Sequence, residues 1–334
     1  MTTSRLLLKT YQKIQPISRV LVVGAAVQQI ILVDHDGFII NKHKVSIGEK
    51  VTIDHIYYQL GGSGVNTAVT FARHGHQSIL ISNLGKDRSA EAVKDFLIDE
   101  NVDTSYLNQL DNQTGTSVVL LDSTTASSTT MNCLNAAKVS KNLEASDLNL
   151  ANPDWLYLTT LNGDLDKTLE FIEQAKKNQI KIFWNPGELE LKQKKKVLGL
   201  LSDIDVLLLN QTEAKLLVQG EILEELISRL SSYTKTVIIT AGNQGSIATD
   251  GEEIYRLAEY EQKIQVDSTG AGDAFGSGFL AASLDGLDFK HSLIAAAANA
   301  TSVISEIGST KGILSANEKY HPLPIQRLYL LFIS

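Results

Sequence analysis

Short and almost uninterrupted apolar runs recur along the chain and alternate with segments of helical pattern. The apolar runs, which we expect to be strands, are 20–23, 78–81, 156–158, 180–184, 206–209 and 237–240. The helical segments are 89–98, 167–177, 212–217 and 222–230. Strands without polar alternation are typical of a sheet that is covered on both faces, and alternating strands and helices favour parallel strands. The sequence therefore predicts an α/β fold with a doubly wound, mostly parallel sheet.

Two stretches, about 30–60 and 114–135, interrupt this rhythm, because they are strand-like and offer no helix. We expect them to form a small, discontinuous β-sheet lid. A further β feature covers 246–256, where Asp250-Gly251 predicts a two-residue hairpin turn. The predicted organisation is an N-terminal extension (1–17), one α/β domain that contains the lid (18–320) and a C-terminal tail (321–334).

Length and composition bound the class of protein. A chain of 334 residues can form one large domain with an embedded smaller element. The formal net charge of −8, without a long run of Lys or Arg, argues against nucleic acid as a partner. The single cysteine excludes an intramolecular disulfide and fits a reducing compartment. No apolar stretch is long enough for a membrane span or a secretory signal. We expect a cytoplasmic protein that acts on a small molecule.

Three of the predicted strands run directly into polar or glycine-rich segments. These segments begin at Asn185-Pro186-Gly187, at Asn210-Gln211-Thr212-Glu213 and at Ala241-Gly242. Ligands of doubly wound sheets bind outside the carboxyl ends of the strands, so we expect a site at this edge. The alternative is that loops commonly contain Gly, Asn and Pro for conformational reasons alone.

The strongest local signal is Asp267-Ser268-Thr269-Gly270-Ala271-Gly272-Asp273, which precedes a helix of small residues. The amides of Gly270, Ala271 and Gly272 would face an anion at the start of that helix. A carboxylate repels an anion, so Asp273 makes sense there if it takes a proton from an attacking hydroxyl while the amides hold a phosphoryl group. We predict that Asp273 is a catalytic base with an ordinary pKa of ~3.9, ionised at neutral pH.

Two other interpretations of this segment are possible. Asp273 could simply begin a helix, with glycines that serve packing. Gly270, Gly272 and Gly276 also imitate a dinucleotide-binding turn, but that turn usually lies in an early βαβ unit with an acidic residue ~20 positions on. The sequence has no Walker-type phosphate loop. His74 and His76 lack a third candidate ligand, so we expect surface residues rather than a zinc site.

A second glycine cluster, Gly61-Gly62-Ser63-Gly64-Val65-Asn66, opens another helix. Gly62 would let the backbone approach a ligand closely, and the Asn66 amide both donates and accepts hydrogen bonds, which suits sugar hydroxyls. The alternative is a hinge between lid and body that contacts no ligand.

Together these motifs resemble the ribokinase-like (PfkB) family of carbohydrate and nucleoside kinases, from about residue 19 to 312. The resemblance implies ATP and Mg²⁺ as cofactors, Asp273 as base and Gly270, Ala271 and Gly272 as anion hole. It implies ATP contacts at Asn185, Thr240, Gly242, Gly245 and Asn299. It assigns Mg²⁺, through water, to Asn210 and Glu213, and a monovalent cation such as K⁺ to Asp267 and Thr269. It further implies a lid that mediates a homodimer.

One position departs from the family pattern. Gln29 stands where members usually carry an Asp that anchors substrate hydroxyls. Gln29 can still bind substrate, together with Gly62 and Asn66, but a charged acceptor is about twice as strong as a neutral one. Ser63 also replaces a Lys common in ribokinases. Three hypotheses stay open: a sugar kinase, a nucleoside kinase, and a non-catalytic ligand-binding protein that retains the fold.

Overall fold

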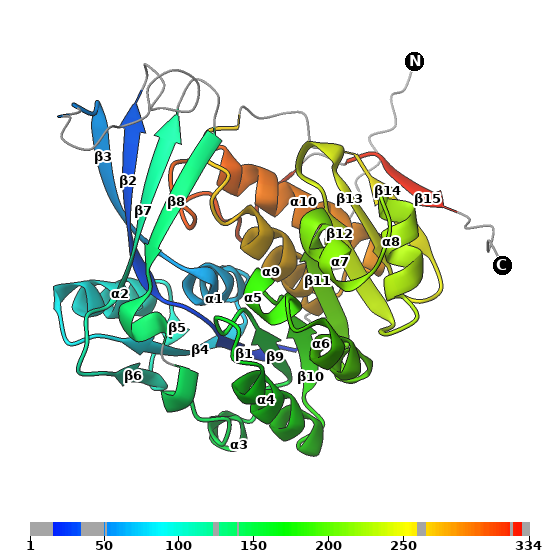
Figure 1. Ribbon diagram of the computed structural model, residues 1–334, viewed down its shortest axis with the longest axis horizontal. Helices are drawn as coiled ribbons and strands as arrows, with labels where there is room; N and C mark the ends of the chain where they lie inside the picture. The colour runs from blue at the N-terminus through cyan, green and yellow to red at the C-terminus, as the bar shows by residue number, and fades with distance from the viewer. Residues whose placement is uncertain are drawn as a thin grey trace, which may run out of the picture.

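The computed structural model describes residues 16–34, 50, 52–122, 127–138, 140–258, 265–320 and 323–328. It consists of a large α/β body and a small β-sheet that projects from one end of the body (Figure 1). This arrangement confirms the predicted doubly wound sheet with a β lid.

An eleven-stranded sheet forms the centre of the body. Its strands are β1 (Arg19–Val23), β4 (Gln77–Leu84), β5 (Val102–Asp103), β6 (Leu107–Gln109), β9 (Trp155–Leu158), β10 (Lys181–Trp184), β11 (Val206–Asn210), β12 (Thr236–Thr240), β13 (Ser246–Thr249), β14 (Ile254–Leu257) and β15 (Ile325–Leu328). They lie in the order β15-β14-β13-β12-β11-β10-β9-β1-β4-β5, and β6 also pairs with β4. Neighbours from β12 to β5 are parallel, whereas β13, β14 and β15 add an antiparallel edge.

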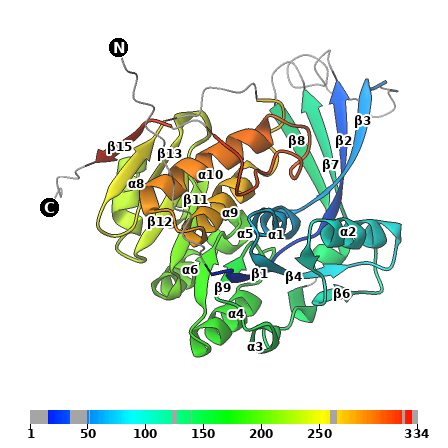
Figure 2. The same cartoon turned by 180° about the vertical axis from the view of Figure 1, so that it is seen from behind.

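Helices cover both faces of this sheet. One face carries α1 (Ser63–Arg73), α2 (Arg88–Asp99), α9 (Ala271–Leu284) and α10 (Phe289–Ile304). The other carries α3 (Asp147–Ala151), α4 (Leu165–Lys177), α5 (Glu188–Leu191), α6 (Lys194–Leu200), α7 (Gln211–Leu217) and α8 (Leu223–Leu230). Figure 2 shows α1, α9 and α10 together on the first face. In β1, Val20 and Val22 pack toward this face and Leu21 and Val23 toward the other, which explains the continuous apolar pattern.

The lid is a four-stranded sheet in the order β3-β2-β7-β8. Its strands are β2 (Val27–Asp34), β3 (His55–Gly61), β7 (Gly115–Asp122) and β8 (Ser127–Cys133). The chain enters the lid directly after β1 and leaves it directly before α1, so the lid stands at the carboxyl ends of the parallel strands (Figure 1). One lid face buries Ile31, Val33, Val119 and Leu121.

Two details of the predicted organisation are wrong. Thr249 pairs with Ile254, so the hairpin loop spans four residues rather than two. The Asp250 carboxylate accepts hydrogen bonds from the amides of Glu252 and Glu253 and thereby stabilises this longer turn. The residues after 320 are also not merely a tail, because β15 pairs with β14 and completes the edge of the main sheet. Residues 1–15 of the predicted extension lie outside the described residues.

Within the described ranges, no helix is long and apolar enough to cross a membrane.

Candidate active site

Asp273 lies in the first turn of α9, three residues after a position that must be glycine. Gly270 has a left-handed backbone (φ 81°), and a Cβ there would lie 2.7 Å from the Cβ of Ser309. Asn66 Nδ2 donates a hydrogen bond of 2.8 Å to Asp273 Oδ2. Burial raises the pKa of Asp273 to about 6, although the hydrogen bond from Asn66 opposes this shift. The sequence-based expectation of an ordinary pKa is therefore wrong.

The amides before Asp273 differ in their availability. Ala271 N–H donates to the carbonyl of Ser268 (3.3 Å) and so closes the turn. Among the described residues, the amides of Gly270, Gly272 and Asp273 have no such partner. Of the three predicted amide donors, Ala271 is therefore engaged within the turn, whereas Gly270 and Gly272, and in addition Asp273, keep free N–H groups at the start of α9.

A hydrogen-bonded chain joins the lid to Asp273. Ser309 Oγ lies 2.8 Å from Asn66 Oδ1 and 3.1 Å from Gln29 Oε1, and it donates its single proton to one or the other of these oxygens. Gln29 is 4% exposed and Asn66 is 3% exposed. The predicted residues Gln29, Asn66 and Asp273 therefore meet, and Ser309 is the link that sequence reasoning missed. Its loop, Gly308-Ser309-Thr310, carries no local signal beyond that of an ordinary turn.

Gln29 belongs to the inner face of the lid. Its register partners are Gln59 on β3 and Ser117 on β7, and paired residues share a face of the sheet. The inner lid face is therefore polar near Asp273 and becomes apolar two residues further along β2, at Ile31.

Gly62 lies at the hinge between lid and body. Its φ is 99°, and a Cβ there would lie 2.6 Å from the carbonyl oxygen of Ala25. The close approach that Gly62 permits is thus between two parts of the backbone, which agrees with the hinge alternative for this residue.

A cavity of about 220 Å³ lies beside the N-terminus of α9. Its polar wall contains the predicted Thr240, Gly242 and Gly245, and Gly272 also lines it. Its apolar wall consists of Ala258, Phe275, Ala297, Ala300 and Ile304. None of the lining residues is Lys or Arg, so an anion there would depend on backbone amides and on the helix dipole.

The structure does not bring Asn299 to this cavity. Asn299 is 1% exposed, donates to the carbonyl of Ala274 and accepts from the amide of Leu314. Ala297, Ala300 and Thr301 share the face of α10 that lines the cavity, whereas Asn299 points away from it. The predicted contact of Asn299 with a nucleotide in this cavity is therefore wrong, because Asn299 lies on a different face of α10.

Asn210 and Glu213 form a reciprocal cap at the start of α7. Asn210 Oδ1 accepts from the Glu213 amide, and Glu213 Oε2 accepts from the Asn210 amide. Burial raises the pKa of Glu213 despite the hydrogen bonds from Asn210, and the nearby carboxylates of Glu188 and Glu190 raise it further. Asn210 is the register partner of Thr240, so this cap borders the wall described above.

The side chains of Asn185 and Asp267 both hydrogen-bond to other groups of the protein. Asn185 Nδ2 donates to the carbonyl of Leu208. The buried Asp267 carboxylate accepts from the amide and hydroxyl of Thr269 and from the amide of Gly308. Asp267 thus ties the loop before α9 to the loop that carries Ser309.

His74 and His76 are not surface residues, contrary to the prediction. Their side chains are 11% and 4% exposed, and both face Asp285 at the end of α9 opposite to Asp273. Within the described part of the chain, no group of three or more His, Cys, Asp or Glu residues is arranged to hold a metal ion.

Comparison with known proteins places the chain in a family. The family model described as pfkB family carbohydrate kinase matches residues 18–316. A ribokinase of Haemophilus influenzae is 28% identical over 284 residues, which are 81% of this chain and 89% of that protein. A nucleoside kinase of Methanocaldococcus jannaschii is 26% identical over 258 residues, covering 75% and 80%.

The fold agrees with this assignment. The structure of Arabidopsis thaliana ribokinase complexed with ribose and ATP superposes with a TM-score of 0.75 at 22% identity, covering 90% of this chain and 96% of that one. The chain belongs to the pfkB family of carbohydrate kinases, which are phosphotransferases with an alcohol acceptor.

Proposed function

We propose that this kinase transfers the γ-phosphoryl group of ATP to a hydroxyl of a sugar or sugar-like small molecule, with Asp273 as the general base. The observation that carries the proposal is the position of Asp273 between two different surroundings. On one side its carboxylate accepts a hydrogen bond from Asn66, which Ser309 links to Gln29 of the lid. On the other side the neighbouring Gly272 lines the cavity, with a free amide among the described residues.

The chemistry of the two sides suits the two substrates. The adenine ring would lie against Phe275, Ala297 and Ala300, and the phosphates would extend toward Gly272. Gln29 and Asn66 offer amide groups that pair with hydroxyls in either direction of hydrogen bonding. A polyhydroxylated acceptor therefore fits under the lid, with one hydroxyl directed at Asp273.

The reaction follows from the pKa of Asp273. With a pKa of about 6, Asp273 is mostly ionised at pH 7 and above and is a stronger base than an ordinary aspartate. It accepts the proton of the acceptor hydroxyl as that oxygen forms its bond to the γ-phosphorus and the bond from this phosphorus to the β-phosphate oxygen breaks. The amides of Gly272 and Asp273 stabilise the charge on the transferred group.

The carboxylates near Asn210 fit a divalent cation. Burial and the nearby carboxylates of Glu188 and Glu190 raise the pKa of Glu213. The three carboxylates together give this place an excess of negative charge, which a bound cation would neutralise. Mg²⁺, held through water by Asn210 and Glu213, would neutralise phosphate charge when bound.

Two further proposals concern K⁺ and the oligomer. The buried Asp267 carboxylate has no ion-pair partner among the described residues, which supports a monovalent cation beside Asp267 and Thr269.

The outer lid face exposes Ile56, Tyr58 and Met131, which supports a homodimer through the lid. Activity in KCl against choline chloride, and sedimentation of a variant with Tyr58→Glu, test these two proposals.

A nucleoside acceptor is the second candidate, because Tyr57 packs with the inner apolar cluster of the lid and could contact a base. ATP consumption over a panel of sugars and nucleosides distinguishes the candidates. Consumption that depends on a sugar supports the first, and consumption that depends on a nucleoside supports the second. Acceptor binding without consumption, in the presence of Mg²⁺ and K⁺, would replace both by a non-catalytic ligand-binding protein.

A further inference from the structure

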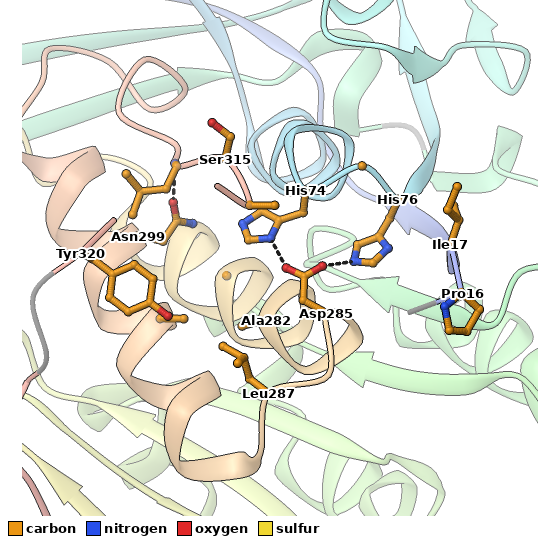
Figure 3. A pocket seen from close by; sticks show the side chains of 15 residues that line it. Pro16, Ile17, His74, His76, Ala282, Asp285, Leu287, Asn299, Ser315 and Tyr320 are labelled. Atoms are coloured by element: carbon orange, nitrogen blue, oxygen red, sulfur yellow. Dashed lines mark hydrogen bonds and ion pairs between the residues drawn. The ribbon is translucent and has the colours of Figure 1, made fainter. Parts of the chain in front are cut away.

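A second cavity, of about 470 Å³, lies at the opposite ends of the two helices that begin at the active site. His74 caps the C-terminus of α1, and Asp285 caps the C-terminus of α9. Because α9 has 14 residues, it places about 21 Å between Asp285 and the turn at Gly270, and Gly278, the cavity residue of α9 nearest to that turn, lies about 12 Å from it. Figure 3 shows the cavity, with His74, His76 and Asp285 on one side. It is therefore separate from the ATP and acceptor sites proposed above.

The polar side of the cavity is incompletely paired. His74 Nδ1 donates to Asp285 Oδ2 at 2.7 Å, whereas His76 Nε2 lies 3.3 Å from Asp285 Oδ1 (Figure 3). The contact of His76 is an ion-pair distance without the alignment of a hydrogen bond, and neither of its ring nitrogens has another partner in the described ranges. The buried ring nitrogens of His76 are not exposed to the cavity, so the group that a ligand can reach on this side is the Asp285 carboxylate, whose side chain is 30% exposed.

The charge of the site favours a cation. The C-termini of α1 and α9 both direct partial negative charge toward the cavity, and the Asp285 carboxylate adds a full charge. Burial raises the pKa of Asp285, but the contacts of its carboxylate with His74 and His76 outweigh this and hold the pKa below its usual value, so the carboxylate stays ionised. No Lys or Arg lines the cavity. Phosphates and carboxylates are therefore unsuitable ligands.

The remaining walls are mostly apolar and give the cavity the size of a ligand site. The apolar lining residues include Ala282, Leu287, Leu314 and Tyr320. Figure 3 labels Leu287 and Tyr320 in the same view as Asp285. The volume lies within the range of about 300–1,000 Å³ that is usual for small-molecule sites. A ligand with an apolar body can fill this space.

We propose that the cavity is a second ligand site, which binds a small organic cation through an ammonium group that donates to Asp285 Oδ1. The apolar body of the cation packs against Ala282 and Leu287. This binding is independent of the phosphoryl transfer proposed above, so it is tested without measuring activity.

The test uses the full-length chain with benzylammonium as the probe, and with benzyl alcohol and benzoate as the neutral and anionic matches. We expect that benzylammonium binds at least about tenfold more tightly than either match in calorimetry, because a charge-assisted hydrogen bond contributes roughly 1.5–3 kcal/mol. With ¹³C-labelled histidine, the probe should shift the ring signals of His74 and His76 among the 7 histidines of the chain.

Two variants and one control complete the design. Asp285→Asn should weaken benzylammonium binding at least about tenfold, and Ala282→Leu should do the same by filling the cavity while the charge stays. Asp288→Asn is the control, since Asp288 pairs with His291 in the same loop but does not line the cavity, and it should leave binding unchanged. Equal binding of benzyl alcohol, absence of binding, or binding that survives Ala282→Leu would overturn the proposal.

Discussion

Removal of the hydrogen bond between Asn66 and Asp273 should shift the pH dependence of catalysis. Asp273 acts as a base only when it is ionised, so kcat/KM of the wild type should fall as the pH falls through about 6. At one pH unit below this value, about a tenth of the plateau should remain. Asn66→Leu keeps a similar side-chain shape but removes the donor that favours the ionised form.

The size of the shift follows from the strength of that bond. A hydrogen bond to a charged group contributes about 1.5–3 kcal/mol, and one pKa unit corresponds to about 1.36 kcal/mol. Because Asp273 is only partly buried, we take the lower end and expect a rise of about one unit. The acid limb of kcat/KM should therefore move from about pH 6 to about pH 7 in Asn66→Leu.

The assay is the rate of ADP formation at saturating ATP and limiting acceptor, measured between pH 5 and pH 9. Ser309→Ala is the control, because it removes a bond to Asn66 but leaves the Asn66 donor on Asp273. Both variants should lower the plateau, but only Asn66→Leu should move the limb. An unchanged limb in Asn66→Leu, or a wild type without a limb near pH 6, would refute the assignment of Asp273 as the titrating base.

Three further predictions concern stability and ATP binding. The pKa of Asp273 rises from 3.8 to about 6 on folding, so its contribution to stability is present below pH ~4 and is lost as the pH rises through 6. At pH 8, the free energy of unfolding measured in urea should therefore be about 2 kcal/mol larger for Asp273→Asn than for the wild type. At pH 4 the two proteins should not differ in this respect. Gly270→Ala should lower the free energy of unfolding by at least about 1–2 kcal/mol because residue 270 has a left-handed backbone. Gly272→Ala, whose added Cβ meets no neighbouring atom, should keep its stability but lower kcat about tenfold or more. Equal stability of the two variants in denaturation would contradict this. Ala300→Trp should fill the cavity beside Gly272 and raise KM for ATP about tenfold or more while KM for the acceptor changes little, and an unchanged KM for ATP would remove the nucleotide from that cavity.

The strands and most helices were predictable because burial on both faces leaves a continuous apolar signal, as in β1 and β11. The edge strand β15 was not, since its sequence is short and half-polar and only its pairing with β14 makes it part of the sheet. The longer turn at Asp250 depends on hydrogen bonds that the Asp250 carboxylate accepts from the amides of Glu252 and Glu253. The preference of Asp-Gly for two-residue turns takes no account of these bonds.

In the candidate site, Asp273 and Asn66, which belong to two dense local motifs, lie within hydrogen-bonding distance of each other. Ser309 was missed because its role depends on a contact between residues more than 240 positions apart. Asn299 was misplaced because the choice between adjacent positions of a helix depends on its rotation against α9. The pKa of Asp273 could not be derived from sequence, since it depends on how fully the folded protein removes water from the carboxylate.

The most direct measurement compares phosphoryl transfer to the best acceptor of the panel by the wild type and by Asp273→Asn at pH 8, with ATP and acceptor affinities measured for both. We predict that kcat falls about 10²–10⁴-fold while both dissociation constants stay nearly unchanged. Full turnover by Asp273→Asn would contradict the role of the carboxylate as the proton acceptor.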